Sequence, residues 1–202
     1  MELVITCTQP MYSDREIALI RSTQAGNLNS FNELVLTYQD RVYNLAYSIL
    51  GTHEAAEDAT QEAFLSAYRK ISIFKTGPFM AWMYRITVNA CYDELRRVKR
   101  RQTLPLEPVD ENMEEFDSPS WMVDPCEQPL ESVERHELRK TIQESIHRLP
   151  VEYRVAIILI DVQEMGYSEA AQVLAIPIGT LKSRVARGRA ILVNWLKRTR
   201  IQ

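Results

Sequence analysis

The chain has 202 residues, of which 46% are hydrophobic and 25% charged, a composition that excludes a disordered or membrane-spanning protein. Its three cysteines, Cys7, Cys91 and Cys126, are odd in number and far apart, which excludes a disulfide framework and a zinc knuckle. The sequence opens without a basic and apolar leader, and no apolar run approaches the roughly 18 residues that cross a bilayer. We therefore expect a cytoplasmic protein with no membrane insertion, metal or cofactor.

The formal net charge of −3 hides a strong asymmetry along the chain. Counting Lys and Arg against Asp and Glu gives +1 for residues 1–104, −10 for residues 105–137 and +6 for residues 138–202. The basic C-terminal part is suited to binding phosphates, and the acidic strip separates it from the rest of the chain.

Helical patterns begin after a short N-terminal segment, residues 1–12, that we expect to be disordered. Two capping boxes follow, Ser13-x-x-Glu16 and Ser30-x-x-Glu33, each with apolar residues at helical spacing behind it. We predict that each capping box opens a helix.

A third helix should begin after Gly51, which ends the helix before it, with Thr52 as its cap. Its buried side is predicted to be a stripe of small residues: Ala56, Ala59, Ala63, Ala67 and Ile71. A second face carries, at spacings of three and four, Asp58, Gln61, Glu62 and Leu65. Such an acidic amphipathic face is either solvated or a partner surface, and the pattern alone leaves both open.

The next helix should run from Phe79 to Arg101, after a break at Thr76-Gly77-Pro78. Aromatic and cationic residues interleave on it and on the loop before it, and the candidates for binding unpaired bases are Lys75, Trp82, Arg85, Asn89, Tyr92, Arg96 and Arg97. Rings stack on bases while cations neutralise phosphates. Core packing explains some of these aromatics equally well, and we expect Trp82 to be at least partly buried.

The acidic strip contains five prolines within 25 residues, which a helix cannot accommodate: Pro105, Pro108, Pro119, Pro125 and Pro129. We predict an extended linker at residues 105–129, between units at residues 13–104 and 130–202. No stretch alternates convincingly as a strand. The predicted fold class is therefore all-α, with two small helical domains joined by an acidic, proline-rich linker.

The C-terminal unit ends in a helix-turn-helix pattern. Helices are predicted over residues 130–149 and from Pro150 to Val162. A short helix at residues 166–174 and a tight turn at residues 175–177 then lead into a last helix that starts at Ile178.

The last helix should turn an apolar stripe inward, consisting of Ile178, Leu181, Val185, Gly188, Leu192 and Trp195. The opposite side carries Lys182, Ser183 and Arg187, which are suited to the base edges of a major groove. Arg184 and Arg189 lie on the flanks, where cations contact phosphates.

Four motifs resemble the extracytoplasmic-function (group IV, sigma-E-like) RNA polymerase sigma factors in order and spacing. They are Gly26-x4-Phe31-x2-Leu34-x3-Tyr38-x3-Val42, Asp58-Ala59-Thr60-Gln61-Glu62-Ala63-Phe64, Trp82-Met83-Tyr84-Arg85-Ile86-x2-Asn89 and Gly179-Thr180-Leu181-Lys182-Ser183-Arg184-x2-Arg187. The resemblance implies that residues 13–104 are sigma region 2 and residues 130–202 are sigma region 4.

The resemblance also implies a function: a transcription initiation factor that binds core RNA polymerase and directs it to promoters. The face of Asp58, Gln61, Glu62 and Leu65 would dock on the clamp helices of the largest subunit, and region 4 on the flap of the second-largest subunit. The base-binding candidates from Lys75 to Arg97 would capture and help melt the minus-ten element. The minus-thirty-five element would be read by Lys182, Ser183, Arg184 and Arg187. Family members are commonly held by an anti-sigma factor, which we expect as a further partner.

Other functional classes fit less well. The chain has only three histidines and no nucleophile paired with a base, so we expect no enzymatic activity. A helix-turn-helix regulator that binds duplex DNA without polymerase remains the alternative. A helical interaction protein that binds no DNA would leave the polar side of the last helix unexplained.

Overall fold

The computed structural model describes residues 14–75, 77–102 and 141–199, and within these residues the chain is helical, without strands. The predicted all-α class is therefore confirmed. The predictions for residues 1–12, for Ser13 and for the linker at residues 105–129 lie outside the described residues.

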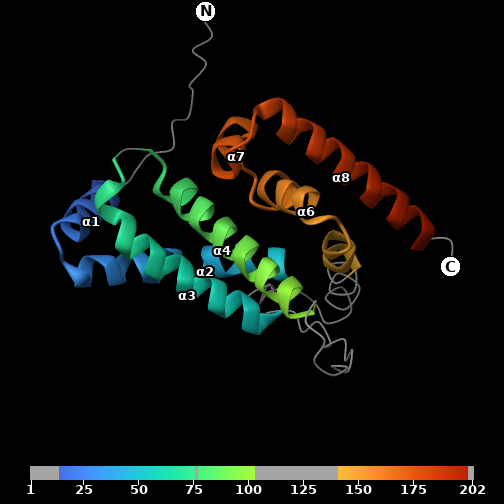
Figure 1. The fold of residues 1–202 in the computed structure, drawn as a ribbon. Helices are drawn as coiled ribbons and strands as arrows, with labels where there is room; N and C mark the ends of the chain where they lie inside the picture. The colour runs from blue at the N-terminus through green and yellow to red at the C-terminus, as the bar shows by residue number, and fades with distance from the viewer. Residues whose placement is uncertain (1–13, 76, 103–140, 200–202) are drawn as a thin grey trace, which may run out of the picture.

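The first part of the structure contains four α-helices and one 3₁₀ turn: α1 (Asp14–Gln24), α2 (Leu28–Leu50), α3 (His53–Lys70), η1 (Ile71–Ile73) and α4 (Phe79–Gln102). The second part contains a helix at residues 141–147, α6 (Val151–Ile157), the π-helical turn η3 (Ile158–Val162), α7 (Tyr167–Leu174) and α8 (Ile178–Thr199). Figure 1 shows α1 to α4 on one side of the molecule and α6 to α8 on the other, with α8 along the outer edge.

The start of α2 differs from the prediction. Asn27 caps the helix, because its Oδ1 accepts from the backbone N–H groups of Asn29 at 3.0 Å and Ser30 at 3.3 Å. Ser30, the predicted cap, is buried inside the first turn, and its hydroxyl donates to Ser22 Oγ at 2.8 Å. The capping box at Ser30 was therefore wrong: an asparagine three residues earlier takes the cap position and leaves Ser30 to join α2 to α1.

The end of α2 matches the prediction. Gly51 adopts a left-handed conformation with φ of +89°, and its N–H donates to the carbonyl oxygen of Tyr47 at 2.9 Å. Thr52 occupies the N-cap of α3, but its side chain makes no capping hydrogen bond. The stripe of alanines predicted on α3 is buried against α2 and α4, and Figure 1 shows these three helices packed side by side.

The helix predicted from Pro150 to Val162 is present but changes pitch midway. Pro150 is the N-cap of α6, and the turn η3 follows, where the N–H of Gln163 donates to the carbonyl oxygen of Ile158 at 2.8 Å. Farther upstream, the helix predicted at residues 130–149 is described only from residue 141. There Ile146 is buried, whereas Ile142 is 41% exposed.

The helix-turn-helix is confirmed. Ala175 turns the chain in a left-handed conformation with φ of +52°, and the N–H of Ile176 donates to the carbonyl oxygen of Ala171 at 3.1 Å. On α8 the buried stripe includes Leu181 and Val185. Gly188 approaches α6 so closely that a Cβ there would lie 2.9 Å from Ile157 Cγ1.

The predicted inward stripe of α8 is wrong at its two ends. Ile178 is 44% exposed and Trp195 is 38% exposed. The Trp195 ring makes a cation–π contact with the guanidinium of Arg148, whose Cζ lies 4.2 Å from the ring centroid.

Candidate functional site

The outer side of α8 presents three exposed polar residues, Lys182, Ser183 and Arg187. They lie opposite Leu181 and Val185, which anchor the helix in the core. The α7–turn–α8 unit therefore holds these side chains outward on a rigid helix, which is the geometry that a major groove admits.

Arg184 occupies a different place from its three neighbours. It is partly buried rather than exposed. The pKa of Tyr92 on α4 is raised by burial, and the positive charge of Arg184 offsets part of that rise. The two side chains therefore lie near one another. The sequence pattern did not predict this proximity, because the two residues belong to separate predicted units.

Arg189, predicted to contact phosphate from the flank of α8, is bound to a carboxylate of the same chain. Its Nε donates to Asp161 Oδ2 at 3.1 Å, and its Nη2 donates to the other carboxylate oxygen. These hydrogen bonds raise the pKa of Arg189. Asp161 belongs to the π-helical turn η3, so the ion pair links α8 to the turn that precedes α7.

Residues spaced by three and four along α4 form one face, defined by Trp82, Arg85, Asn89, Tyr92 and Arg96. Arg85, Asn89 and Arg96 are exposed, whereas Trp82 and Tyr92 are partly buried. The Trp82 ring packs against Phe74 and Phe79, with centroids 5.1 Å and 5.5 Å away. The expectation that Trp82 is partly core is therefore confirmed. Lys75 is exposed in the loop before α4.

Two arginines of the predicted base-binding set are paired with acidic neighbours. Arg96 Nη1 lies 3.0 Å from Asp93 Oδ1. Arg97 Nη2 lies 2.8 Å from Glu94 Oε2 and 3.6 Å from Asp58 Oδ2. The Arg96–Asp93 pair is exposed on both sides and can open at little cost in free energy, whereas the Glu94 side chain that binds Arg97 is only 14% exposed.

The face of Asp58, Gln61, Glu62 and Leu65 on α3 is exposed. Together with α4 it lines an open groove of about 540 Å³, in which Arg97 bridges toward Asp58. The structure therefore places Arg97 beside the predicted partner surface of α3 rather than on the Asn89 face of α4. Sequence reasoning missed this, since the pairing joins residues of two helices.

A second groove of about 620 Å³ runs on the other side of the same α3 face, between α2 and α3. Its lining is largely apolar: Leu28, Phe31, Val35, Tyr43, Phe64, Leu65 and Tyr68. Leu65, 45% exposed, stands on the ridge between the two grooves. The sequence pattern did not reveal the apolar groove.

Within the described ranges, His, Cys, Asp and Glu side chains nowhere gather in threes that could hold a metal ion. The helices of the same ranges include none whose length and apolar character would let it cross a membrane.

Comparison with known proteins shows that two parts of the chain match models of known protein families. The model for Sigma-70 region 2 matches residues 34–101, and that for Sigma-70, region 4 matches residues 139–192. The ECF RNA polymerase sigma factor SigW of Bacillus subtilis is 36% identical over 179 residues, which cover 88% of this chain and 95% of that protein. The ECF RNA polymerase sigma-E factor of Escherichia coli is 33% identical over 178 residues, covering 87% and 91%.

Two solved structures share the arrangement of helices. The sigma factor RpoE of Bartonella quintana, in complex with the anti-sigma factor NepR, has a TM-score of 0.60 at 26% identity, with 83% of this chain and 96% of that chain covered. CnrH, in complex with the cytosolic domain of CnrY, has a TM-score of 0.64 at 23% identity, covering 91% and 98%. At 23% identity, the likeness to CnrH shows a shared fold alone.

Proposed function

Because this chain belongs to the extracytoplasmic-function RNA polymerase sigma factors, we propose that its two helical units contact a promoter at two points while α3 holds the polymerase. The protein is a promoter-directing transcription initiation factor and not an enzyme. Its place of action is the cytoplasm, where polymerase and promoter DNA are found.

The observation that carries the proposal is the outer side of α8. Lys182, Ser183 and Arg187 are exposed on a helix whose opposite side is anchored by Leu181 and Val185. A Lys or Arg donor can bind guanine O6 and N7, and a short hydroxyl fits either base type. We assign these three residues, with Arg184 at the edge, to the minus-thirty-five element.

The minus-ten element is assigned to α4 and the loop before it. Arg85, Asn89 and Arg96 are exposed on one face of α4, which also carries the partly buried rings of Trp82 and Tyr92. Exposed cations beside rings suit a melted strand, because bases stack while phosphates are neutralised. Lys75 is assigned to the same strand. Arg97, held by Asp58 and Glu94, belongs instead at the boundary with the polymerase surface.

We assign the binding of polymerase to the exposed face of α3. Asp58, Gln61 and Glu62 supply polar contacts, and Leu65 supplies an exposed apolar one between the two grooves. This mixture suits the clamp helices of the largest subunit, because an apolar centre with a polar rim is typical of protein interfaces. We further propose that region 4 contacts the flap of the second-largest subunit and that an anti-sigma factor binds the chain, as one binds the similar RpoE of Bartonella quintana.

The domain bounds follow from the same assignment. Region 2 would comprise residues 13–104 and region 4 residues 130–202, with the acidic linker at residues 105–129 between them. The family matches at residues 34–101 and 139–192 lie within these bounds and support them.

Run-off transcription tests the proposal. Bacterial core polymerase is assayed on genomic promoter fragments with and without this protein, and transcripts should start at specific sites only when the protein is present. Tight binding to free duplex with no effect on core polymerase would favour the alternative, a polymerase-independent regulator.

Two variants test the assigned surfaces. Arg187→Ala should weaken promoter binding by about 1 to 3 kcal/mol and relax the preference at one upstream base, because a base-edge contact carries about that much discrimination. Equal weakening on all upstream sequences would limit Arg187 to phosphate contact. Asp58→Arg should abolish retention of core polymerase, whereas Asp40→Arg, the same charge change at an exposed position on α2, should not.

A further inference from the structure

The chain leaves α3 through the turn η1 and enters the loop that carries Lys75, which we assigned to the minus-ten element. Phe74 ends this turn, and its N–H donates to the carbonyl oxygen of Ile71 at 3.1 Å. A 3₁₀ turn has poorer hydrogen-bond geometry than an α-helix. The direction in which the loop starts therefore depends on further contacts.

Those contacts come from Gln24, the last residue of α1. Its Nε2 donates to the carbonyl oxygen of Ile71 at 2.9 Å and to that of Phe74 at 2.7 Å. Both partners are acceptors, so the nitrogen of the amide and not its oxygen must face them, and its two N–H groups can serve both at once. Because hydrogen bonds are directional, this one side chain fixes the turn at its start and at its end.

The helix that carries Gln24 is itself held at both ends. Near its start, the hydroxyl of Tyr38 on α2 donates to Glu16 Oε1 at 2.6 Å. Near its end, Ile20 and Thr23 are buried, and Ile20 belongs to the apolar core of α2, α3 and α4. Gln24 therefore reaches the turn from a fixed support.

The ring of Phe74 is held from the opposite direction. It packs edge-on against Phe79, with centroids 5.6 Å apart, and lies 5.1 Å from the ring of Trp82. Phe79, where α4 begins, is 1% exposed. The loop at residues 75–78 thus starts and ends at fixed residues, and Lys75 directly follows the one that Gln24 holds. Over so short a span, the direction of Phe74 determines where Lys75 lies, since consecutive Cα atoms are about 3.8 Å apart.

We propose that Gln24 is a positioning residue for recognition of the minus-ten element, and that it acts by directing the loop of Lys75 toward the DNA strand. This rests on the proposed function, in which that loop and α4 bind a melted strand. A loop that is ordered before binding loses less entropy on binding, and a contact discriminates between bases when its geometry is fixed. Because Gln24 is exposed, it contributes more to the orientation of the loop than to the stability of the fold.

Hydrogen exchange tests whether Gln24 holds the turn. Gln24→Leu keeps the size of the side chain but removes both donors, and amides in a peptide covering residues 71–75 should exchange about fivefold faster or more. The thermal midpoint should stay within a few degrees of that of the parent chain. Gln24→Lys again provides N–H donors at the end of a flexible side chain and should restore exchange close to the parental rate.

Base preference tests what the turn does for recognition. Full-length chain and core polymerase are assayed together on a pool of promoters in which the minus-ten bases are randomised, and the transcripts are sequenced. A disfavoured base should reduce transcription by the parent chain about fivefold or more. Gln24→Leu should weaken this preference about threefold or more at one or two adjacent bases and leave the other bases unaffected. The extra charge of Gln24→Lys attracts phosphates on all sequences alike, so its preference should be close to parental.

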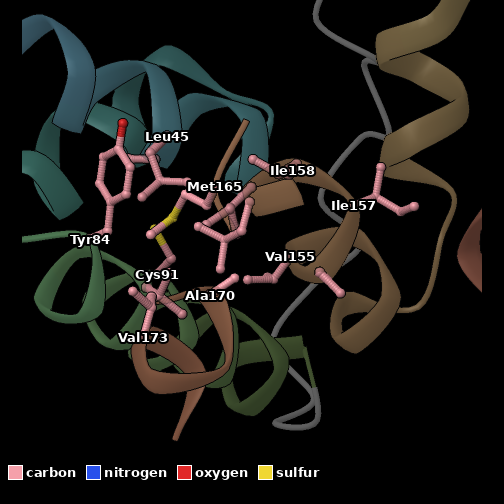
Figure 2. Packing of buried hydrophobic residues seen from close by; sticks show 14 of the residues in the cluster. Leu45, Tyr84, Cys91, Val155, Ile157, Ile158, Met165, Ala170 and Val173 are labelled. Atoms are coloured by element: carbon pink, nitrogen blue, oxygen red, sulfur yellow. The ribbon is translucent and has the colours of Figure 1, made fainter. Parts of the chain in front are cut away.

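Tyr84→Phe is the matched control on α4. The Tyr84 hydroxyl donates to Gln163 Oε1 at 2.6 Å, so this variant also loses a side-chain hydrogen bond. Tyr84 lies away from the loop, in a core that the two regions share and that includes Leu45, Cys91 and Val173 (Figure 2). Its base preference at the minus-ten element should equal that of the parent. The same change of preference in Tyr84→Phe as in Gln24→Leu would overturn the role of Gln24.

Three further results would overturn this role. The first is parental exchange at residues 71–75 in Gln24→Leu, and the second is faster exchange with a parental base preference. The third is an equal fall in transcription from every member of the pool, which would make Gln24 a structural residue alone. Failure of the proposed function is distinguishable from all three, because the parent chain itself would then direct no transcription by core polymerase.

Discussion

Replacing Arg154 by methionine should destabilise the whole chain, because this side chain joins three backbone carbonyls that α-helix ends leave without partners. Its guanidinium donates to Ile49 at 2.7 Å, to Leu149 at 3.2 Å and to His147. Burial lowers the pKa of Arg154, so part of the gain from these bonds is offset by desolvation of the charge. Hydrogen bonds from a charged donor are worth about 1.5 to 3 kcal/mol each, and after that offset we expect a loss of about 3 kcal/mol.

Urea titration followed by circular dichroism measures this loss as a change in the free energy of unfolding, and thermal unfolding should show a midpoint about 6 to 12 °C lower. Arg154→Lys is the control, because it keeps a positive charge but cannot reach three carbonyls with one ammonium group. It should lose somewhat less than Arg154→Met. A loss below about 1 kcal/mol for Arg154→Met would refute the assignment of Arg154 as the joint between the helix ends.

The remaining predictions concern α8, a buried histidine and a surface ion pair. Gly188→Ala should lower the free energy of unfolding by about 1 to 3 kcal/mol in urea titrations, because a Cβ there enters the side chains of α6, whereas Gly179→Ala on the same helix meets nothing and should not. Burial, and secondarily a nearby arginine, lowers the pKa of His147 to about 4. Between its unfolded pKa near 6.5 and about 4 only the unfolded chain binds the proton, so stability should fall by up to about 3 kcal/mol as the pH drops from 7 to 4. Asp161→Asn should cost less than about 1 kcal/mol, since the pair is exposed, but should raise affinity for duplex DNA at low salt by releasing Arg189.

Each of these predictions has a result that contradicts it. Equal stability changes in the two glycine variants would contradict the close approach of α8 to α6. The His147→Gln variant should have a flatter dependence of stability on pH, and an unchanged slope would assign the effect to other groups. Unaltered DNA affinity in Asp161→Asn would mean that Arg189 does not reach phosphate even when released.

What depends on local pattern was predictable from the sequence. The alanine stripe of α3 and the helix-turn-helix at Ala175 follow from spacing and turn chemistry within a few residues, and both are present. The failure at Ser30 is also local: Asn27 and Ser30 are both good caps, and the choice between them depends on where the chain leaves α1.

What depends on contacts between distant residues was not predictable. Arg97 meets Asp58, and Arg189 meets Asp161, across helices whose relative placement no single-helix pattern encodes. The same holds for Tyr84 and its partner in the second region, 79 residues away. Periodicity shows which face of a helix is apolar, but it does not tell which other helix covers that face.

The core shared by the two regions has a consequence for protein engineering. Exchanging region 4 for that of a relative would redirect the chain to other promoters only if the new α7 presents a surface that fits Leu45, Tyr84 and Cys91. A poor fit would leave these side chains exposed and favour aggregation of the chimera. The promoter-reading helix and the hidden face of region 2 must therefore be exchanged or redesigned together.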